Sequence, residues 1–143
     1  MSFNSDLLFS LFTLSFAVDS LNVRCIGRAL PGPCYAVYTV GDYCYIGGGS
    51  EFMIMNITNP AHPVRVGYCD TPGSIECIYV SGSYAYVADG GGGLRIIDIS
   101  DPAHPVEVGY YDTRGSSNCV YVSGSYAYVA DCGDGLRIID ISV

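Results

Sequence analysis

The stretch CIYVSGSYAYVADGGGGLRIIDIS, residues 77–100, decides the fold, because it returns almost unchanged as CVYVSGSYAYVADCGDGLRIIDIS at residues 119–142. The two copies differ at only three aligned positions, and equivalent residues such as Leu94 and Leu136 are 42 positions apart. A period near forty residues that contains strand-like segments is typical of β-propellers and related repeat arrays.

Each copy predicts four short β-strands. In the middle copy these are residues 77–80, 83–89, 94–100 and 105–113, which are rich in Val, Ile and Tyr. Gly82 suits a tight hairpin turn after the first strand, since glycine adopts positive φ without steric cost. Apolar side chains on both faces of the second and third strands predict a sheet that is covered on both sides.

The repeat can be traced back toward the N-terminus. Gly41 aligns with Gly82 at an offset of 41, so a third and more diverged copy precedes the two similar ones. We therefore predict an all-β fold, a β-propeller made of about three four-stranded antiparallel blades. The expected segments are an outer strand at 22–30 and blades at 34–72, 75–113 and 117–143.

The two segments 94–98 and 136–140, both LRIID, resemble the signature of the LVIVD repeat family. The surrounding pattern YVSGSYAYVAD and GLRIIDISDPAHPVEVGYYDT is similar to that repeat over nearly the whole chain from residue 22 onward. The resemblance implies a β-propeller of the kind found in exported or cell-surface proteins of bacteria and archaea. The first copy departs from the signature, with FMIMN at residues 52–56.

Three blades are fewer than the four to eight that propellers usually contain. A blade face of about 350 Å² that stayed open would forgo on the order of 9 kcal/mol of apolar burial. We therefore expect the chain to be a fragment of a longer repeat protein. The alternative is a homo-oligomer in which two chains share one ring.

The composition excludes some classes of partner. Only six residues are Lys or Arg, and the formal net charge is -8. Such a chain repels phosphate backbones, so we expect no nucleic-acid partner. Its seven cysteines include no CxxC pair, which removes the usual zinc-knuckle and thioredoxin motifs. Cys77 and Cys119 lie in apolar strands and are predicted to be small buried hydrophobes.

The apolar run at residues 7–18, LLFSLFTLSFAV, is too short to span a bilayer as a helix. Its length suits a secretory signal, and Ser15 and Ala17 provide a small-x-small cleavage pattern. Asp6 and the lack of Lys or Arg before the run argue against a signal. We expect residues 1–17 to direct export, and the alternative is an apolar segment that packs on the domain.

Several carboxylates invite a functional interpretation. Asp131 and Asp134 lie three apart in a tight loop, but they offer fewer oxygens than a calcium site needs, so we predict a hairpin turn whose Asp accepts backbone N–H groups. Asp98 and Asp140 share a repeat position with Asn56. A carboxylate that Asn replaces is expected to hold the following loop rather than to act as an acid or base.

Two histidines and several tyrosines complete the list of candidates. His62 and His104 share a Pro-Ala-His-Pro context and are predicted to lie in exposed connections, too far apart to bind one metal. The tyrosines of the second strands are predicted to pack between blades, whereas those of the last strand are freer to contact a partner. The first group contains Tyr84, Tyr86, Tyr126 and Tyr128, and the second contains Tyr110 and Tyr111.

We therefore expect an exported, non-enzymatic propeller module that binds a protein or glycan at the cell surface, with no catalytic residues, cofactor or metal. One alternative is a hydrolase or lyase with a metal in the propeller channel. The candidates for such a site are Glu76, Asn118 and Tyr35, which do not form a ligand set. The other alternative is a purely structural repeat, such as a filament subunit.

Overall fold

The computed structural model describes residues 23–29 and 32–142. The proposed export signal at residues 1–17 lies outside these residues. The described part is all-β, as predicted, and contains no helix long and apolar enough to cross a membrane. Its strands are β1 (Ala36–Val40), β2 (Tyr43–Gly48), β3 (Glu51–Asn56), β4 (Val64–Asp70), β5 (Cys77–Ser81), β6 (Tyr84–Ala88), β7 (Leu94–Asp98), β8 (Val106–Tyr111), β9 (Ser116–Ser123), β10 (Tyr126–Cys132) and β11 (Gly135–Asp140).

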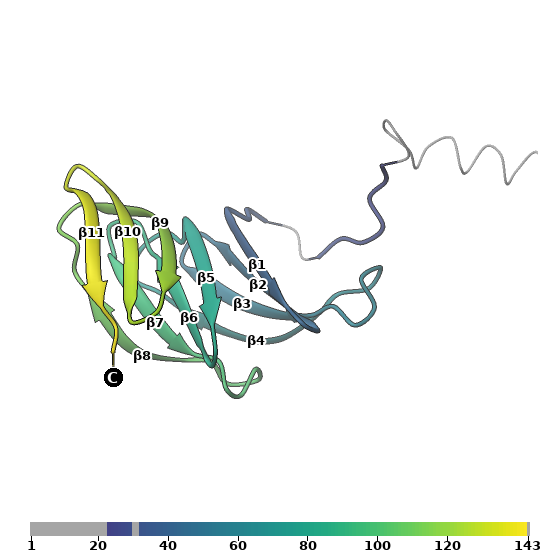
Figure 1. Ribbon diagram of the computed structural model, residues 1–143. Helices are drawn as coiled ribbons and strands as arrows, with labels where there is room; N and C mark the ends of the chain where they lie inside the picture. The colour runs from purple at the N-terminus through teal and green to yellow at the C-terminus, as the bar shows by residue number, and fades with distance from the viewer. Residues whose placement is uncertain (1–22, 30–31, 143) are drawn as a thin grey trace, which may run out of the picture.

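The strands form three antiparallel sheets, which we call blades. Blade 1 has the order β1-β2-β3-β4, blade 2 has the order β5-β6-β7-β8, and blade 3 contains β9, β10 and β11. The blades stack face to face, with the first strands β1, β5 and β9 side by side (Figure 1). This is the blade arrangement of a β-propeller, so the predicted fold class is confirmed.

Glycine turns set the register of each blade. Gly41, Gly82 and Gly124 follow the first strand of their blades and have φ values of +56°, +57° and +57°. These positive values close two-residue hairpins, such as the one that pairs Ser81 with Tyr84. The second strand is thereby placed in the same register in all three blades.

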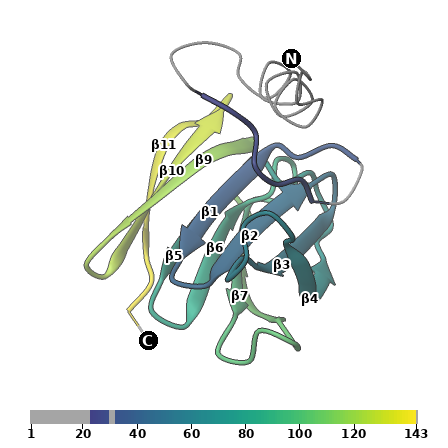
Figure 2. The same ribbon diagram turned by 90° about the vertical axis from the view of Figure 1, so that its right-hand side faces the viewer.

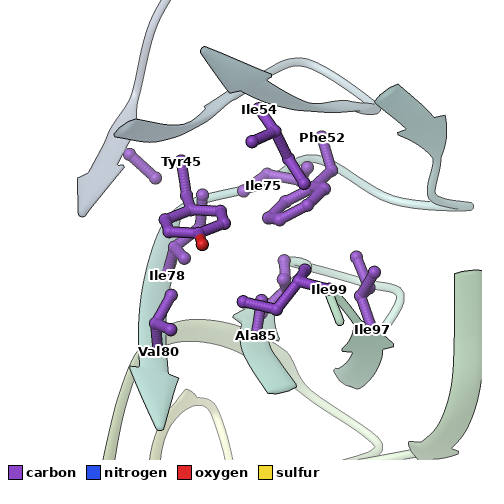
Figure 3. Close-up of a cluster of buried hydrophobic side chains, with 11 residues drawn as sticks. Tyr45, Phe52, Ile54, Ile75, Ile78, Val80, Ala85, Ile97 and Ile99 are labelled. Atoms are coloured by element: carbon purple, nitrogen blue, oxygen red, sulfur yellow. The ribbon is translucent and has the colours of Figure 1, made fainter. Parts of the chain in front are cut away.

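The first core lies between blades 1 and 2. Side chains of blade 1, including Tyr45, Phe52 and Ile54, pack on Ile78 and Val80 of blade 2 (Figure 3). Strand β6 contributes to both of its neighbours, because successive side chains point to opposite faces of a sheet. Ala85 and Val87 face blade 1, and Tyr86 and Ala88 face blade 3; the prediction of a sheet covered on both sides is confirmed.

Blade 2 buries one of its faces against blade 3. Blade 3 carries the same residue types on its own equivalent face, but most of that face is exposed. Leu94 of blade 2 is 0% exposed, whereas Leu136 at the same repeat position is 65% exposed. The repeated set, which we call the free face, is Cys119, Tyr121, Tyr128, Ala130, Leu136 and Ile138. Its counterpart in blade 2 is Cys77, Tyr79, Tyr86, Ala88, Leu94 and Ile96, the same six residue types in the same order.

The outer strand expected at residues 22–30 is not seen in the described part of that segment. Residues 23–29 have no strand structure and pass close to the β3–β4 connection, where Gly27 approaches the carbonyl oxygen of Pro60. The last strand of the chain, β11, lies at the opposite end of the stack of blades from β1 (Figures 1 and 2).

Candidate interaction surface

The third strand of every blade ends in the same loop anchor. Oδ1 of Asp98 accepts a hydrogen bond of 2.8 Å from the amide of Ser100, and Oδ1 of Asp140 accepts one of 2.9 Å from Ser142. Asn56 accepts from Thr58 at 3.0 Å in blade 1. The serine hydroxyl and amide lower the pKa of Asp98 and of Asp140. The predicted structural role is confirmed.

The buried carboxylate of Asp89 fastens the segment that links blades 1 and 2. It accepts hydrogen bonds from the Thr71 hydroxyl at 2.6 Å and from the Gly73 amide at 2.8 Å. Nε of Arg95 lies 3.8 Å from its Oδ2. Burial raises the pKa of Asp89, and the hydrogen bonds and Arg95 oppose this rise. Asp89 thus accepts a backbone N–H group from the connection that precedes its blade.

Asp131 occupies the same position in blade 3 with different contacts. Its carboxylate is buried, and neither oxygen has a hydrogen-bond partner among the described residues. Arg137, the counterpart of Arg95, instead forms an ion pair with Asp134. The two carboxylates of this loop therefore do not converge, and Asp131 does not accept the backbone N–H group that the sequence predicted.

Sequence reasoning missed the Thr71–Asp89–Arg95 arrangement, although a signal for it exists. Copy three retains Thr113, Asp131 and Arg137 at the equivalent positions, whereas copy one replaces all three residues together, by Leu30, Gly48 and Met53. Joint replacement within one chain is the pattern expected of residues that act as a unit.

The histidines are exposed, as predicted. Nδ1 of His104 lies 2.8 Å from Oδ2 of Asp101 on the same connection, and this interaction lowers the pKa of Asp101. His62 lies in the equivalent connection of blade 1 and is exposed as well. Each histidine thus belongs to a local turn.

The channel candidates Glu76, Asn118 and Tyr35 are all exposed. Within residues 23–29 and 32–142, no group of three or more His, Cys, Asp and Glu side chains could hold a metal ion. The described residues thus offer no built site for metal chemistry.

The tyrosines of the outer strands take part in two contacts with arginines, which we call the Arg–Tyr stacks. The guanidinium of Arg65 lies 5.0 Å from the ring centre of Tyr68, and that of Arg95 lies 4.8 Å from the ring centre of Tyr110. An ion pair of 3.2 Å holds each arginine, with Glu51 in blade 1 and Glu107 in blade 2.

The two stacks are built from different strands. Tyr68 and Tyr110 share a repeat position, yet Arg65 lies on β4 and Arg95 on β7. Arg65 aligns with Glu107, whereas Glu51 aligns with Gly93 and Arg95 aligns with Met53, so the two ion pairs use different repeat positions. Neighbouring blades thus each carry an arginine beside an exposed tyrosine, although the Arg65 side chain is 43% exposed and the Arg95 side chain only 15%.

The tyrosines of the second strands divide into two groups. Tyr86 is buried against blade 3, which confirms the packing prediction for it, whereas Tyr128 is half-buried on the free face and does not pack between two described blades. Tyr84 and Tyr126, at the starts of β6 and β10, are exposed, so the packing prediction is wrong for them. Tyr110 and Tyr111 are exposed, which confirms that they are free to contact a partner.

The prediction that Cys77 and Cys119 are both buried is wrong. Cys77 is half-buried and Cys119 is exposed, because no blade formed by the described residues covers the free face on which Cys119 lies. Burial raises the pKa of Cys77.

The model of the LVIVD repeat matches residues 31–71, 72–113 and 114–143. The chain belongs to the LVIVD repeat family. A search of curated protein sequences finds no match. The three matched LVIVD repeats correspond to the three blades.

Solved structures of β-propeller proteins resemble this LVIVD chain in fold. BamB from Moraxella catarrhalis aligns with a TM-score of 0.63 at 13% identity, over 80% of this chain and 35% of BamB. The computationally designed Ika8 protein gives a TM-score of 0.60 at 9% identity, over 80% of this chain and 35% of Ika8. The LVIVD chain therefore spans about a third of the length of either protein.

Proposed function

We propose that this LVIVD chain is a non-enzymatic interaction module, a section of a β-propeller that binds a protein or glycan through its outer strands. The observation that carries the proposal is the pair of Arg–Tyr stacks on adjacent blades. Tyr68 is 55% exposed and Tyr110 is 67% exposed, so each ring is available to a ligand.

The stacks have the chemistry of binding hot spots. Tyr and Arg are enriched among the residues that contribute most to binding, because both offer large flat surfaces and hydrogen bonds. The ion pairs with Glu51 and Glu107 fix the arginines before a ligand arrives, which reduces the entropy lost on binding. A hollow of about 470 Å³ adjoins the first stack and is lined by Arg65, Val66, Gly67, Tyr68, Ala103, His104 and Pro105.

The test uses a Tyr68→Ala/Tyr110→Ala double variant and a panel of soluble polysaccharides and immobilised peptides. We expect the double variant to bind its best probe at least tenfold more weakly than wild type. Tyr126→Ala is the matched control, because Tyr126 is exposed but lies on an inner strand. Equal affinity of the double variant and wild type would refute the proposal, and the class of probe that binds separates glycan from protein.

We also propose that another LVIVD blade covers the free face in the working particle. This proposal is supported by the six residue types that the free face shares with the buried face of blade 2. The far face of blade 1 is also apolar, with Val37, Ile46 and Met55. That blade comes either from a longer form of this chain or from a second copy.

Mass in solution distinguishes these sources. A second copy predicts a dimer of this chain that Leu136→Asp dissociates, because the substitution places a charge on the shared face. A continuing chain predicts a reading frame with further GLRIIDIS repeats. A stable monomer together with a reading frame that has no further repeat would exclude both.

Finally, we propose that the protein works outside the cytoplasm, guided by the apolar run at residues 7–18. Expression with and without residues 1–17 tests this. Export of the full chain, with a mature N-terminus near residue 18, is expected, and equal retention of both forms would contradict it.

A further inference from the structure

We propose that Cys77 and Cys119 are a redox-active pair, which a small-molecule disulfide oxidises to a disulfide bond that joins blades 2 and 3. The two sulfur atoms are 3.6 Å apart. They occupy the same repeat position on β5 and β9, neighbouring strands of adjacent blades. The proposal is independent of the interaction surface.

The surrounding contacts hold the two sulfurs opposite one another. The amide of Val120 donates to Sγ of Cys77 at 3.4 Å, which ties Cys77 to the strand that carries Cys119. Two residues further along the same strands, the rings of Tyr79 and Tyr121 lie 4.9 Å apart. The strands are thus in equivalent register at both positions. A disulfide bond of about 2.05 Å requires the sulfurs to approach by only about 1.5 Å.

The cysteine pair is found at only one of the two joints between the described blades. Blade 1 has Ala36 at the position of Cys77, so the joint between blades 1 and 2 contains no equivalent pair. Cys69 lies on β4, the outer strand of blade 1, away from the joint between blades 2 and 3, and burial raises its pKa to about 11.

The exposure of the two thiols indicates the order of events. The exposed Cys119 thiolate attacks the disulfide of oxidised glutathione, which forms a mixed disulfide and releases one glutathione thiolate. The Cys77 thiolate then attacks Sγ of Cys119 and displaces the second glutathione. Both protein thiols lose their protons and two electrons pass to glutathione, so the reaction balances.

The test compares intact masses of the full chain after oxidation with glutathione, denaturation and alkylation of the remaining thiols. We expect Cys77 and Cys119 of wild type to lose alkylation with no glutathione adduct on either, whereas other exposed thiols such as Cys132 gain only adducts, and dithiothreitol should restore all of them. Cys77→Ser should instead accumulate a glutathione adduct on Cys119, because the resolving thiol is absent. Cys69→Ser and Cys132→Ser are the controls, and each should still form the linked product.

Two results would overturn the proposal. One is full alkylation of both Cys77 and Cys119 in oxidised wild type. The other is an intramolecular link that persists in Cys77→Ser or in Cys119→Ser. The oxidised form should also unfold at a higher temperature than the reduced form in wild type but not in Cys119→Ser, which shows that the link forms in the folded protein.

Discussion

The Thr71 hydroxyl donates a 2.6 Å hydrogen bond to Oδ1 of Asp89, and this contact joins the end of one blade to the end of the second strand of the next. Asp89 also accepts from the Gly73 amide and lies beside Arg95. Through Arg95 the interior carboxylate is linked to Tyr110 on the outer strand. The blade joint and the proposed binding surface therefore share one polar chain of contacts.

Asp89→Ala should destabilise the fold by about 1–3 kcal/mol, because the buried Thr71 hydroxyl and the Gly73 amide lose their acceptor. Asp131→Ala is the matched control at the same repeat position. Its carboxylate is buried without a hydrogen-bond partner among the described residues, so its removal should cost little or be stabilising. Urea denaturation of both variants measures the difference, and equal losses of stability would contradict this account.

Asp89 should also make the stability of the fold depend on pH. Burial raises its pKa above the ordinary value of 3.8. The proton on Asp89 therefore stabilises the folded state fully below pH 3.8, and this contribution is lost as the pH rises through the folded-state pKa.

Asp89→Asn removes this titration. As the pH rises above 3.8, wild type should lose stability relative to the variant. The lowered pKa values of Asp98, Asp101 and Asp140 affect both proteins alike and cancel in the comparison. Parallel stability profiles in urea titrations would show that Asp89 does not titrate differently on folding.

Leu94→Ala should cost about 2–5 kcal/mol, the range for a leucine deleted from a packed core. Leu136→Ala changes the same residue type at the same repeat position, but Leu136 is 65% exposed. In the isolated chain this control should change the free energy of unfolding by less than about 0.5 kcal/mol. A large cost at Leu136 would show that the free face is covered in solution.

Gly73→Ala should be strongly destabilising, because a Cβ atom there would lie 1.9 Å from the carbonyl oxygen of Asp89. The neighbouring backbone cannot move without breaking the joint that Asp89 holds. Gly91→Ala is the control, since nothing lies within 4 Å of its added Cβ atom and its φ is not positive. Thermal unfolding of the two variants should separate them clearly, and similar melting temperatures would contradict the steric argument.

The sequence predicted most of the fold, because its signals are local. Alternation of Ala85, Tyr86 and Val87 gave the strands and their two covered faces, and glycine turns gave the register. The loop role of Asp98 and Asp140 also followed, since their donors lie two residues away.

The remaining features depend on contacts between distant residues. Thr71 lies 18 residues before Asp89, in the preceding blade, so its hydrogen bond is not visible as a motif. The Arg–Tyr stacks could not be predicted as a repeated feature, because Arg65 and Arg95 do not occupy the same repeat position. Whether Cys119 is exposed depends on whether a further blade packs on blade 3, and the sequence of a single repeat does not show this.

The sharing of six residue types by the two faces has an evolutionary consequence. Because blades 2 and 3 carry the same six residue types on this face, unequal recombination that inserts or deletes one 42-residue unit between them preserves the residue types of the face. Related genes should therefore differ by whole units more readily than by partial ones, and the circumference of the particle can change in a single genetic event.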